Sequence, residues 1–370
     1  MPSILLMALE DRILMGPGPS NPYPEVAAAF VRPVLGHLDP AFLEVLDETC
    51  DRLRTAFRTT NSLTFPLSGT GSAGMEASFV NFVRPGDPVV VGVNGLFGER
   101  MCEVASRQGA QVIRVEAPWG EPIDPLALLE AHPDPVAIAV VHAETSTGVL
   151  NSIEPLHRGK GDAILIADTV TSLCGVEVDV GVWDVDVAYS ATQKCLGVPP
   201  GLAPLTVSPR ALEKRVERPS SWYFDLGLIS GYVEAGVGRT YHHTAPISMV
   251  YALHAGLGAI LDEGLEFVWE RHLTCGVELQ QGLLKLGLEL LAPEGHRLPQ
   301  LTSVLVPDDL PAGLDEAGVR SRLLREYGIE IGAGVGPLAG KIWRIGCMGH
   351  TARMRNVKLL VGALGEVLER

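Results

Sequence analysis

The sequence predicts an α/β protein whose sheet is mostly parallel, followed by a smaller α+β domain. Two observations carry this prediction. Several short runs are apolar at nearly every position, as a strand must be when helices cover both of its faces. The segments between the first of these runs are long enough for the crossover helices that parallel strands need. At about 150 residues per domain, a chain of 370 residues has room for a large and a small domain.

The large domain is expected to begin with an amphipathic helix. Asp39 and Pro40 have the form of an N-cap and a first-turn proline, and apolar residues then recur at helical spacing up to Phe57. Seven apolar runs follow, and they are the expected strands: 63–67, 89–93, 112–115, 136–141, 163–167, 185–189 and 202–207. Crossover helices are expected at 74–83 and 96–108.

Beyond about residue 245 the pattern changes to long helices and a few short strands. Helices are expected at 248–261, 267–286, 316–327 and from Thr351 onward, and strands at 302–306 and 341–345. Near the start of the chain, the Pro- and Gly-rich stretch 16–22 cannot be helical, because prolines remove donors and restrict the residues before them. It is either an ordered loop or a hinge.

Composition and charge exclude several classes of function. Hydrophobic residues make up 46% and charged residues 20%, which is ordinary globular usage. The net charge of −15 has the wrong sign for binding nucleic acid or anionic lipid. No apolar run reaches the roughly 18 residues that span a bilayer, and the start of the chain turns acidic at Glu10 without a basic region. We expect a cytoplasmic protein without nucleic-acid or membrane partners.

The cysteines and histidines predict neither a disulfide framework nor a metal site. The six cysteines are scattered without a C-x-x-C pair, and the ten histidines include neither H-x-x-x-H nor H-E-x-x-H. Buried, reduced thiols are expected, and no metal.

A glycine-rich turn is the first candidate for chemistry. Residues 69–74, with the sequence GTGSAG, match the pattern G-x-G-x-x-G after an expected strand. A dinucleotide site of this type has an acidic residue at the end of the next strand, but that strand ends in Asn94 here. Small residues still let the backbone approach a ligand, and the N–H groups at a helix start attract an anion. We expect a phosphate site, with a merely tight turn as the alternative.

A carboxylate and a lysine are expected at the same edge of the sheet. Asp168 ends an apolar run, and ligands of open α/β sheets bind outside the carboxyl ends of the strands. Its alternative role is to cap the segment that follows. Lys194 lies between the run 185–189 and the stretch 195–201, which has few residues suited to solvent. A desolvated, reactive amine is therefore the sharper hypothesis, and a solvated surface charge is the alternative.

A phosphate cradle, a carboxylate at a strand end and a buried lysine together suit pyridoxal 5'-phosphate. Lysine forms a Schiff base with this cofactor, the carboxylate keeps the pyridine nitrogen protonated, and the helix start holds the phosphate. Six motifs then resemble, in chain order, the class V aminotransferases: 15–20 (MGPGPS), 68–74 (SGTGSAG), 142–148 (HAETSTG), 190–194 (SATQK), 241–244 (YHHT) and 344–346 (RIG). The resemblance covers nearly the whole chain and is greatest to the alanine-glyoxylate and serine-pyruvate aminotransferase group.

The resemblance implies the fold and the assembly. The fold is the PLP-dependent transferase fold type I, with a mostly parallel seven-stranded sheet in the large domain and an α+β domain at the C-terminal end. The expected division is an N-terminal segment 1–22 that contributes to the active site, a large PLP-binding domain 23–250 and a small domain 251–370. The family also implies a homodimer.

The resemblance further implies the cofactor contacts. Lys194 is the Schiff-base lysine, and Asp168 is the partner of the pyridinium nitrogen. The remaining contacts that it implies are the phosphate turn at Thr70, Gly71 and Ser72, joined by Gln193, the stacking aromatic ring at Phe97 and a hydroxyl at Thr145. Two positions depart from some members of the family, which carry tryptophan at the position of Phe97 and histidine at the position of Ser72.

Residues near both ends of the chain complete the implied site. Tyr241 and Thr244 are implied to reach the phosphate of the neighbouring subunit. Arg344 is implied to bind the substrate carboxylate through two parallel hydrogen bonds, a geometry that lysine cannot offer, and its alternative role is a structural salt bridge. Gly16 is implied to contact the substrate as well.

The expected function is an aminotransferase that moves the amino group of alanine or serine to glyoxylate or pyruvate. Ureidoglycine and an aminophosphonate are alternative donors. A PLP lyase such as a cysteine desulfurase is the nearest rival, with Cys347 as the cysteine nearest in sequence to Arg344. A nicotinamide oxidoreductase built on residues 69–74 and a structural or adaptor protein are the remaining alternatives.

Overall fold

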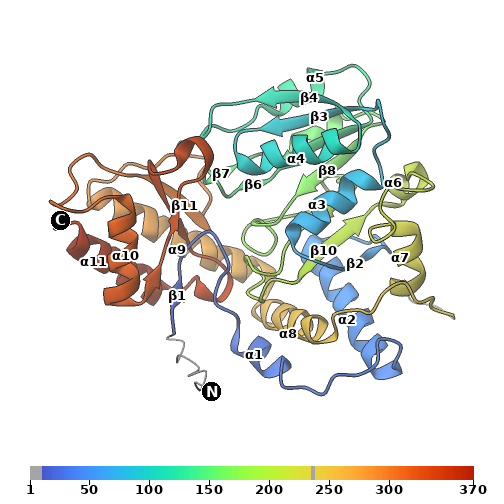
Figure 1. Cartoon of the computed structure of the whole chain (residues 1–370), viewed down its shortest axis with the longest axis horizontal. Coiled ribbons are helices and arrows are strands. Elements are labelled where there is room, and N and C mark those ends of the chain that lie inside the picture. Colours follow the sequence, from blue (N-terminus) through green and yellow to red (C-terminus); the bar gives the residue numbers. More distant parts are fainter. Residues whose placement is uncertain (1–10, 235–237) are drawn as a thin grey trace, which may run out of the picture.

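A seven-stranded sheet forms the centre of the larger part of the molecule (Figure 1). The computed structural model describes residues 11–234 and 238–370. The strands follow one another across the sheet in the order β2 (Thr64–Ser68), β10 (Leu202–Val207), β9 (Val187–Tyr189), β8 (Ile164–Asp168), β5 (Ala137–Val141), β3 (Pro88–Val93) and β4 (Gln111–Glu116). Strand β10 runs antiparallel to β2 and β9, and the other neighbouring pairs are parallel. The expected mostly parallel sheet is confirmed.

The burial of each strand follows its place in the sheet. All residues of β5, β8 and β10 are buried, in agreement with their continuous apolar sequences. Strand β4 lies at the edge and exposes Gln111, Arg114 and Glu116. Charged side chains on an edge strand hinder pairing with another chain.

Helix α2 (Pro40–Phe57) has the predicted start. The Asp39 side chain accepts a hydrogen bond from the Ala41 amide at 2.9 Å, and the helix ends at Arg58, which takes a left-handed conformation. Phe42 and Phe57, like the apolar residues spaced between them, are buried against β2 and against α8 (Ile247–Glu263).

The crossover helices α3 (Gly71–Val80) and α4 (Leu96–Arg107) begin directly after β2 and β3. Helix α3 starts three residues before the expected position at residue 74. The two glycines of its first turns explain the difference, because they let the helix lie close to the sheet. A Cβ atom at Gly74 would lie 2.8 Å from the Tyr189 Cβ, and one at Gly71 would lie 2.9 Å from a methyl carbon of Val170.

Several short helices connect the larger elements and were not expected from the sequence. They are α1 (Pro24–Ala29), α5 (Pro125–Glu130), η1 (Glu154–Arg158), α6 (Pro209–Lys214), α7 (Leu226–Val233), η2 (Gly336–Leu338) and η3 (Gly349–Thr351). Each is too short to show a clear helical period.

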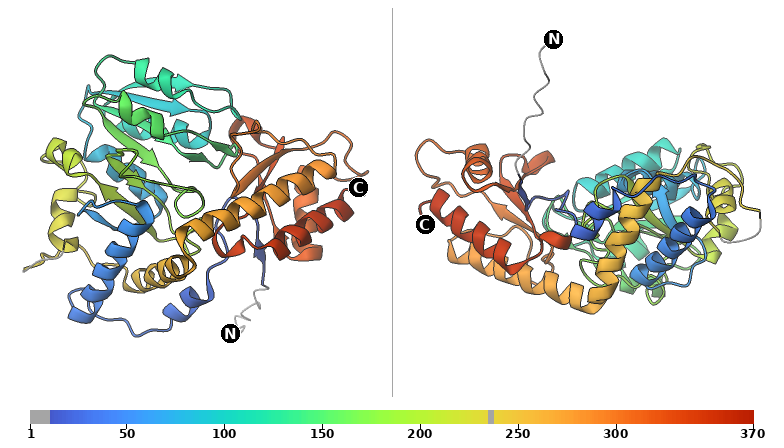
Figure 2. Two further views of the ribbon diagram at one scale, coloured as in Figure 1. Left: turned by 180° about the vertical axis from the view of Figure 1, so that it is seen from behind. Right: turned by 90° about the horizontal axis from the view of Figure 1, so that it is seen from below.

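Within the described residues, the smaller part of the molecule contains a three-stranded antiparallel sheet and three α-helices. Its sheet has the order β11 (Leu301–Leu305), β14 (Ile342–Gly346) and β13 (Gly332–Ala333), and its helices are α9 (Leu265–Lys285), α10 (Glu316–Tyr327) and α11 (Met354–Val367). Figure 2 shows α9 continuing from the end of α8 along this part. The sequence predicted β11 and β14 but not β13, whose two residues are too few to form a pattern.

The N-terminal segment joins the two parts. Strand β1 (Ile13–Leu14) pairs with β12 (Ile329–Glu330) in the smaller part, while Tyr23 packs in the core of the larger part. A second short pair, β6 (Ala143–Glu144) and β7 (Val149–Leu150), forms a hairpin next to the central sheet. The stretch 16–22 is therefore an ordered loop held at both ends.

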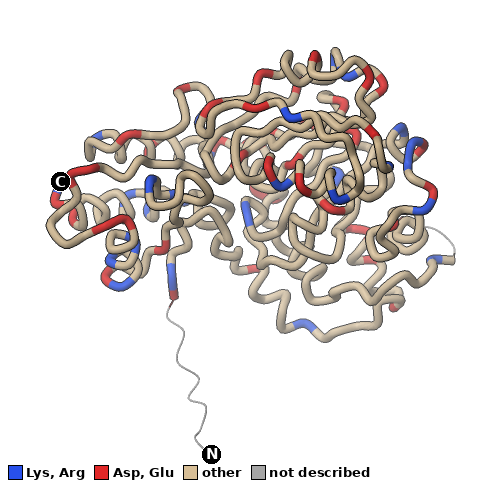
Figure 3. Tube along the Cα trace, turned by 45° about the horizontal axis from the view of Figure 1, so that its top comes forward, with Lys and Arg blue, Asp and Glu red and all other residues tan. Residues whose placement is uncertain are grey.

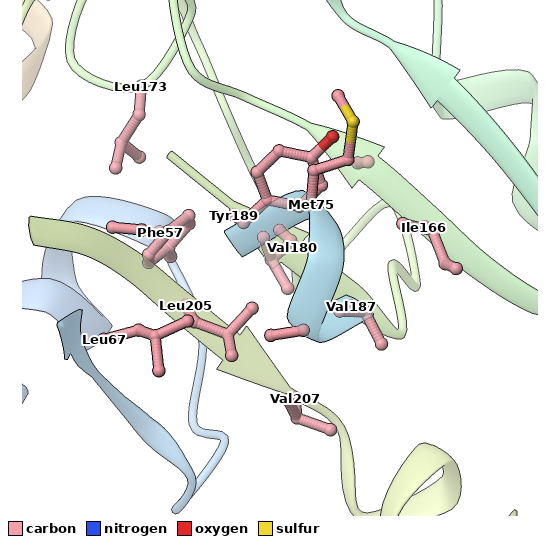
Figure 4. Close-up of a cluster of buried hydrophobic side chains, with 14 of the residues drawn as sticks. Phe57, Leu67, Met75, Ile166, Leu173, Val180, Val187, Tyr189, Leu205 and Val207 are labelled. Atoms are coloured by element: carbon pink, nitrogen blue, oxygen red, sulfur yellow. The ribbon is translucent and has the colours of Figure 1, made fainter. Parts of the chain in front are cut away.

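Two separate clusters of buried side chains match the two parts. One extends from Tyr23 to Val268, and the other combines Met15 with residues between Cys275 and Leu368. Figure 4 shows a portion of the first, in which Met75 of α3 lies beside Tyr189 of β9. The division at residues 22 and 250 remains a proposal, and the first cluster includes Tyr251 to Val268, so helix α8 packs with the larger part.

Lys and Arg are interspersed with Asp and Glu along the chain in both parts (Figure 3). Among the residues that the structure describes, no helix combines the length and the apolar character needed to cross a membrane.

Candidate active site

Asp168 lies at the carboxyl end of β8, in the middle of the sheet, and is 3% exposed. Its Oδ2 accepts a hydrogen bond from the Tyr189 hydroxyl at 2.9 Å, and its Oδ1 accepts one from the Val170 amide at 2.8 Å. Burial raises the pKa of Asp168 to about 6, although both hydrogen bonds act in the opposite direction. The contact with Val170 is the expected cap, and the contact with Tyr189 engages the second oxygen of the carboxylate.

Lys194 lies in the connection between β9 and β10, as predicted, and its amine donates to the Pro17 carbonyl. Burial and the positive charge of Arg344 lower the pKa of Lys194 to about 8. The N-terminal loop holds this connection, because Ser20 Oγ donates to the Lys194 carbonyl at 2.7 Å. Gly18 has a φ of +113°, which favours glycine, and it lies beside the amine, since a Cβ there would lie 2.7 Å from the Lys194 Nζ.

The expected phosphate turn is the start of α3. Gly69 has a φ of +132°, which favours glycine, and Thr70 is the N-cap residue, with a side chain that makes no capping hydrogen bond. Gly71 packs against the segment after Asp168, since a Cβ there would lie 2.9 Å from a methyl carbon of Val170. Thr70 and Ser72 are exposed at the mouth of the turn.

Phe97 and Arg100 stand next to this turn on the first turns of α4. The Arg100 guanidinium donates to Ser72 Oγ at 3.4 Å and lies 5.0 Å from the centre of the Phe97 ring. Phe97 is half-buried, so one part of its ring is accessible to a ligand.

Arg344, on β14, reaches the same region from the smaller part. Its Nε donates to the Ala333 carbonyl at 2.7 Å and its Nη1 to the Thr145 carbonyl at 3.4 Å. Burial lowers its pKa, and none of the ion pairs within residues 11–234 and 238–370 involves it. The structural salt bridge considered above is therefore absent from the part of the chain that the structure describes.

Thr145 and Gly16 flank Arg344. The Thr145 hydroxyl is buried and hydrogen-bonded to the Thr171 hydroxyl at 2.8 Å. A Cβ at Gly346 would lie 1.9 Å from the Gly16 carbonyl oxygen, which shows how closely the N-terminal loop follows β14.

Tyr241 and Thr244, two of the expected site residues, lie on the surface of the single chain. Tyr241 is 60% exposed, and its hydroxyl lies 3.5 Å from Thr244 Oγ1. Their segment is nevertheless tied to the phosphate turn, because His243 Nε2 is hydrogen-bonded to Ser68 Oγ at 2.8 Å, just before Gly69.

The family description Aminotransferase class-V matches residues 22–344. The chain belongs to the class-V aminotransferases. It is similar to the (S)-ureidoglycine–glyoxylate transaminase of Bacillus subtilis, with 38% identity over 97% of this chain and 91% of that protein. It is equally similar to the alanine–glyoxylate aminotransferase of Drosophila melanogaster, with 38% identity over 97% of this chain and 93% of the relative.

Solved structures agree with this assignment. The alanine–glyoxylate aminotransferase of a Nostoc species is 45% identical over 98% of this chain and 97% of its own, with a TM-score of 0.93. A cysteine desulfurase of Thermococcus onnurineus superposes with a TM-score of 0.76 at 16% identity, which shows a common fold only. The predicted fold type and the prediction of a PLP-dependent transaminase are confirmed, and the nicotinamide and adaptor alternatives are excluded.

The residues of this class-V aminotransferase fit pyridoxal 5'-phosphate. The glycine-lined start of α3 offers a phosphate cradle that a side chain at Gly71 would fill. Gln193 Oε1 and His142 Nδ1 are buried without a hydrogen-bond partner, so polar groups remain for a ligand. The buried amine of Lys194 and the buried carboxylate of Asp168 both lie near this cradle, as covalent attachment and a charged ring nitrogen require.

The proposed desulfurase cysteine is not placed for attack. Cys347 is completely buried, and its contact with Cys275 together with burial raises its pKa well above the usual value. A reactive thiol needs the opposite environment, exposed and electropositive.

Sequence reasoning missed several residues of this site. Tyr189 ends an expected strand, and burial and the charge of Asp168 raise its pKa, so it stays a hydrogen-bond donor. Pro17 and Glu144 lie inside the motifs 15–20 and 142–148. Only the contact of Pro17 with Lys194 and that of Glu144 with α4 distinguish them from other loop residues. Arg100 carries no signal other than its spacing from Phe97 on a helix.

A cavity of about 730 Å³ lies elsewhere, at the amino ends of the parallel strands. Its arginines are already paired, Arg58 with Glu177 and Arg210 with Asp186. This cavity lies at the opposite end of the sheet from Asp168, where ligands of such sheets do not bind.

Proposed function

We propose that this aminotransferase moves the amino group of a small amino acid, alanine or serine, to glyoxylate or pyruvate in a ping-pong cycle. The observation that carries the proposal is Arg344, a half-buried cation with carbonyl partners only, which suits a single substrate carboxylate. Relatives named for alanine and glyoxylate support this choice. Because another relative is named for ureidoglycine, that donor is the second candidate.

Bound pyridoxal 5'-phosphate supplies an aldehyde that accepts the amino group and a ring that takes up the electrons left by the α-proton. Lys194 would hold this cofactor through its amine, and the same amine would take up the α-proton of the substrate and give it back. Its lowered pKa leaves a sizeable share of neutral amine near neutral pH. Asp168 would keep the ring nitrogen protonated through its buried carboxylate.

The remaining proposed contacts orient the reactants. Thr70, Gly71, Ser72 and Gln193 hold the phosphate, Phe97 stacks on the ring, and the Thr145 hydroxyl contacts the cofactor. Thr145 also fixes Arg344 through its carbonyl, so one short segment contacts both the cofactor and the substrate-binding arginine. Gly16 leaves room for the substrate beside Arg344.

A donor panel tests this function. We expect alanine or serine to convert the yellow cofactor form of the enzyme with the highest kcat/KM, and glyoxylate or pyruvate to restore it. The measurement is stopped-flow absorbance with alanine, serine, ureidoglycine, an aminophosphonate and aspartate. In Arg344→Lys, which cannot form the two parallel bonds, kcat/KM should fall for every carboxylate donor while the spectrum stays unchanged. A preference for ureidoglycine would make ureidoglycine the donor in place of alanine or serine. Sulfide release from cysteine would overturn the transaminase assignment.

We also propose a homodimer in the cytoplasm, in which Tyr241 and Thr244 complete the phosphate pocket of the partner subunit. The exposure of Tyr241 at a segment bonded to the phosphate turn supports a shared site. The six cysteines are free and buried, which agrees with a reducing compartment.

Mixed dimers test the shared site. A Lys194→Ala chain and a chain with Tyr241→Ala and Thr244→Arg should each be inactive as homodimers. Co-refolding of equal amounts should restore about a quarter of wild-type activity, because about half of the dimers are mixed and each has one intact site of two. If proven mixed dimers stay inactive, Tyr241 and Thr244 belong to their own subunit's pocket or to none.

A further inference from the structure

Glu144 is a completely buried carboxylate that the mechanism above does not use. It ends the short strand β6 and points toward the start of α4. Its Oε2 accepts hydrogen bonds from the amides of Phe97 at 3.1 Å and Gly98 at 3.3 Å. Its Oε1 accepts the Ser146 amide at 3.0 Å and the Ser146 hydroxyl at 2.5 Å.

These bonds hold the whole first turn of α4. Ser146 Oγ in turn accepts the Leu96 amide at 2.9 Å, so the first three amides of the helix end on Glu144 or on its partner. Amides at a helix start have no partner within the helix and carry a partial positive charge, which a carboxylate satisfies. The approach is close, since a Cβ at Gly95 would lie 2.4 Å from the Glu144 Cδ.

The charge of Glu144 also reaches the substrate side of the site. Burial lowers the pKa of Arg344, and the negative charge of Glu144 counteracts this. Glu144 joins none of the ion pairs formed between described residues. Burial without a cation in contact raises the pKa of Glu144 to about 7, although its hydrogen bonds to Ser146 and Gly98 act in the opposite direction.

We propose that Glu144 is a positioning residue for the stacking ring: by fixing the first turn of α4 it holds Phe97 in the orientation that packs on the cofactor. This inference rests on the proposed role of Phe97. Glu144 touches neither the cofactor nor the substrate in this arrangement and acts through the helix alone.

The test is a double-mutant cycle read by cofactor affinity and not by turnover. Phe97→Leu should weaken the binding of pyridoxal 5'-phosphate to the cofactor-free enzyme about fivefold, the share expected for one aromatic stack. Glu144→Ala should have a similar effect and should reduce the circular dichroism of the bound cofactor band. Glu144→Gln keeps one acceptor oxygen and is the less disruptive substitution. Its cofactor affinity should lie between those of the wild type and Glu144→Ala.

The decisive variant combines both changes. If Glu144 acts through Phe97, Glu144→Gln with Phe97→Leu binds cofactor no more weakly than Phe97→Leu alone. Asp186→Asn, which alters another buried carboxylate away from the site, serves as the control and should lower the Tm without changing cofactor affinity. Additive losses, or normal affinity in Glu144→Gln, overturn the inference. If Phe97→Leu itself changes nothing, the stacking assignment fails instead.

Discussion

Lys194→Ala should abolish covalent attachment of the cofactor and lower kcat by about 10³-fold or more, the share that a positioned acid–base group supplies. Lys194 is placed by the connection from β9 and by the loop that carries Pro17, and burial lowers its pKa to about 8. A neutral amine is the form that adds to an aldehyde and that takes a proton, so the same shift serves both tasks. Borohydride reduction followed by mass spectrometry of peptides measures the attachment directly.

Lys160 provides the matched control for this substitution. It is also a buried lysine, at 4% exposure, but it forms an ion pair with Asp186 at 2.9 Å. Lys160→Ala should therefore lose stability, seen as a lower Tm, and keep the cofactor attached at Lys194. Attachment that persists in Lys194→Ala would place the reactive lysine elsewhere.

Asp168→Asn has the second largest expected effect. The charge-assisted hydrogen bond between the carboxylate and the protonated ring nitrogen is worth about 1.5 to 3 kcal/mol, so the half-reaction with alanine should slow by about 10- to 100-fold. Asparagine can still accept the Val170 amide, and the fold should persist. Single-turnover absorbance gives the rate, and far-UV circular dichroism verifies the fold.

Tyr189→Phe separates the two roles of Asp168. It removes the hydroxyl that donates to Asp168 Oδ2 and leaves the carboxylate charged, so its effect on the rate should be much smaller than that of Asp168→Asn. If Asp168→Asn slows the reaction by less than about tenfold, equivalent to about 1.4 kcal/mol, the residue is better explained as the cap of the segment at Val170.

Local sequence patterns predicted an element correctly where a single chemical cause determines it. Asp39 and Pro40 predict the start of α2 because a cap and a fixed φ act within one turn. The apolar runs predict the strands because strands buried on both faces must be apolar throughout. The start of α3 was predicted three residues too late, since the close contacts of Gly71 with Val170 and of Gly74 with Tyr189 exist only in the folded chain.

The candidate active site shows a second limit of prediction from the sequence. Phe97 and Arg344 were placed through resemblance, and nothing in their local sequence distinguishes them from core and surface residues. Their contacts depend on partners far along the chain, Glu144 for the first and Ala333 with Thr145 for the second. The residues of such a pair are not related by a helical or a strand period, so a single sequence does not reveal that they are in contact.

The sequence by itself determined the sheet, the strand end that carries Asp168 and the connection that carries Lys194, because each follows from the alternation of apolar runs along the chain. The tertiary structure alone decided that the N-terminal loop supplies the partner of Lys194 and that Glu144 lies under the first turn of α4. Folding brings these residues together from segments 177 and 47 positions apart, where burial and hydrogen bonding, and no local preference, set the geometry.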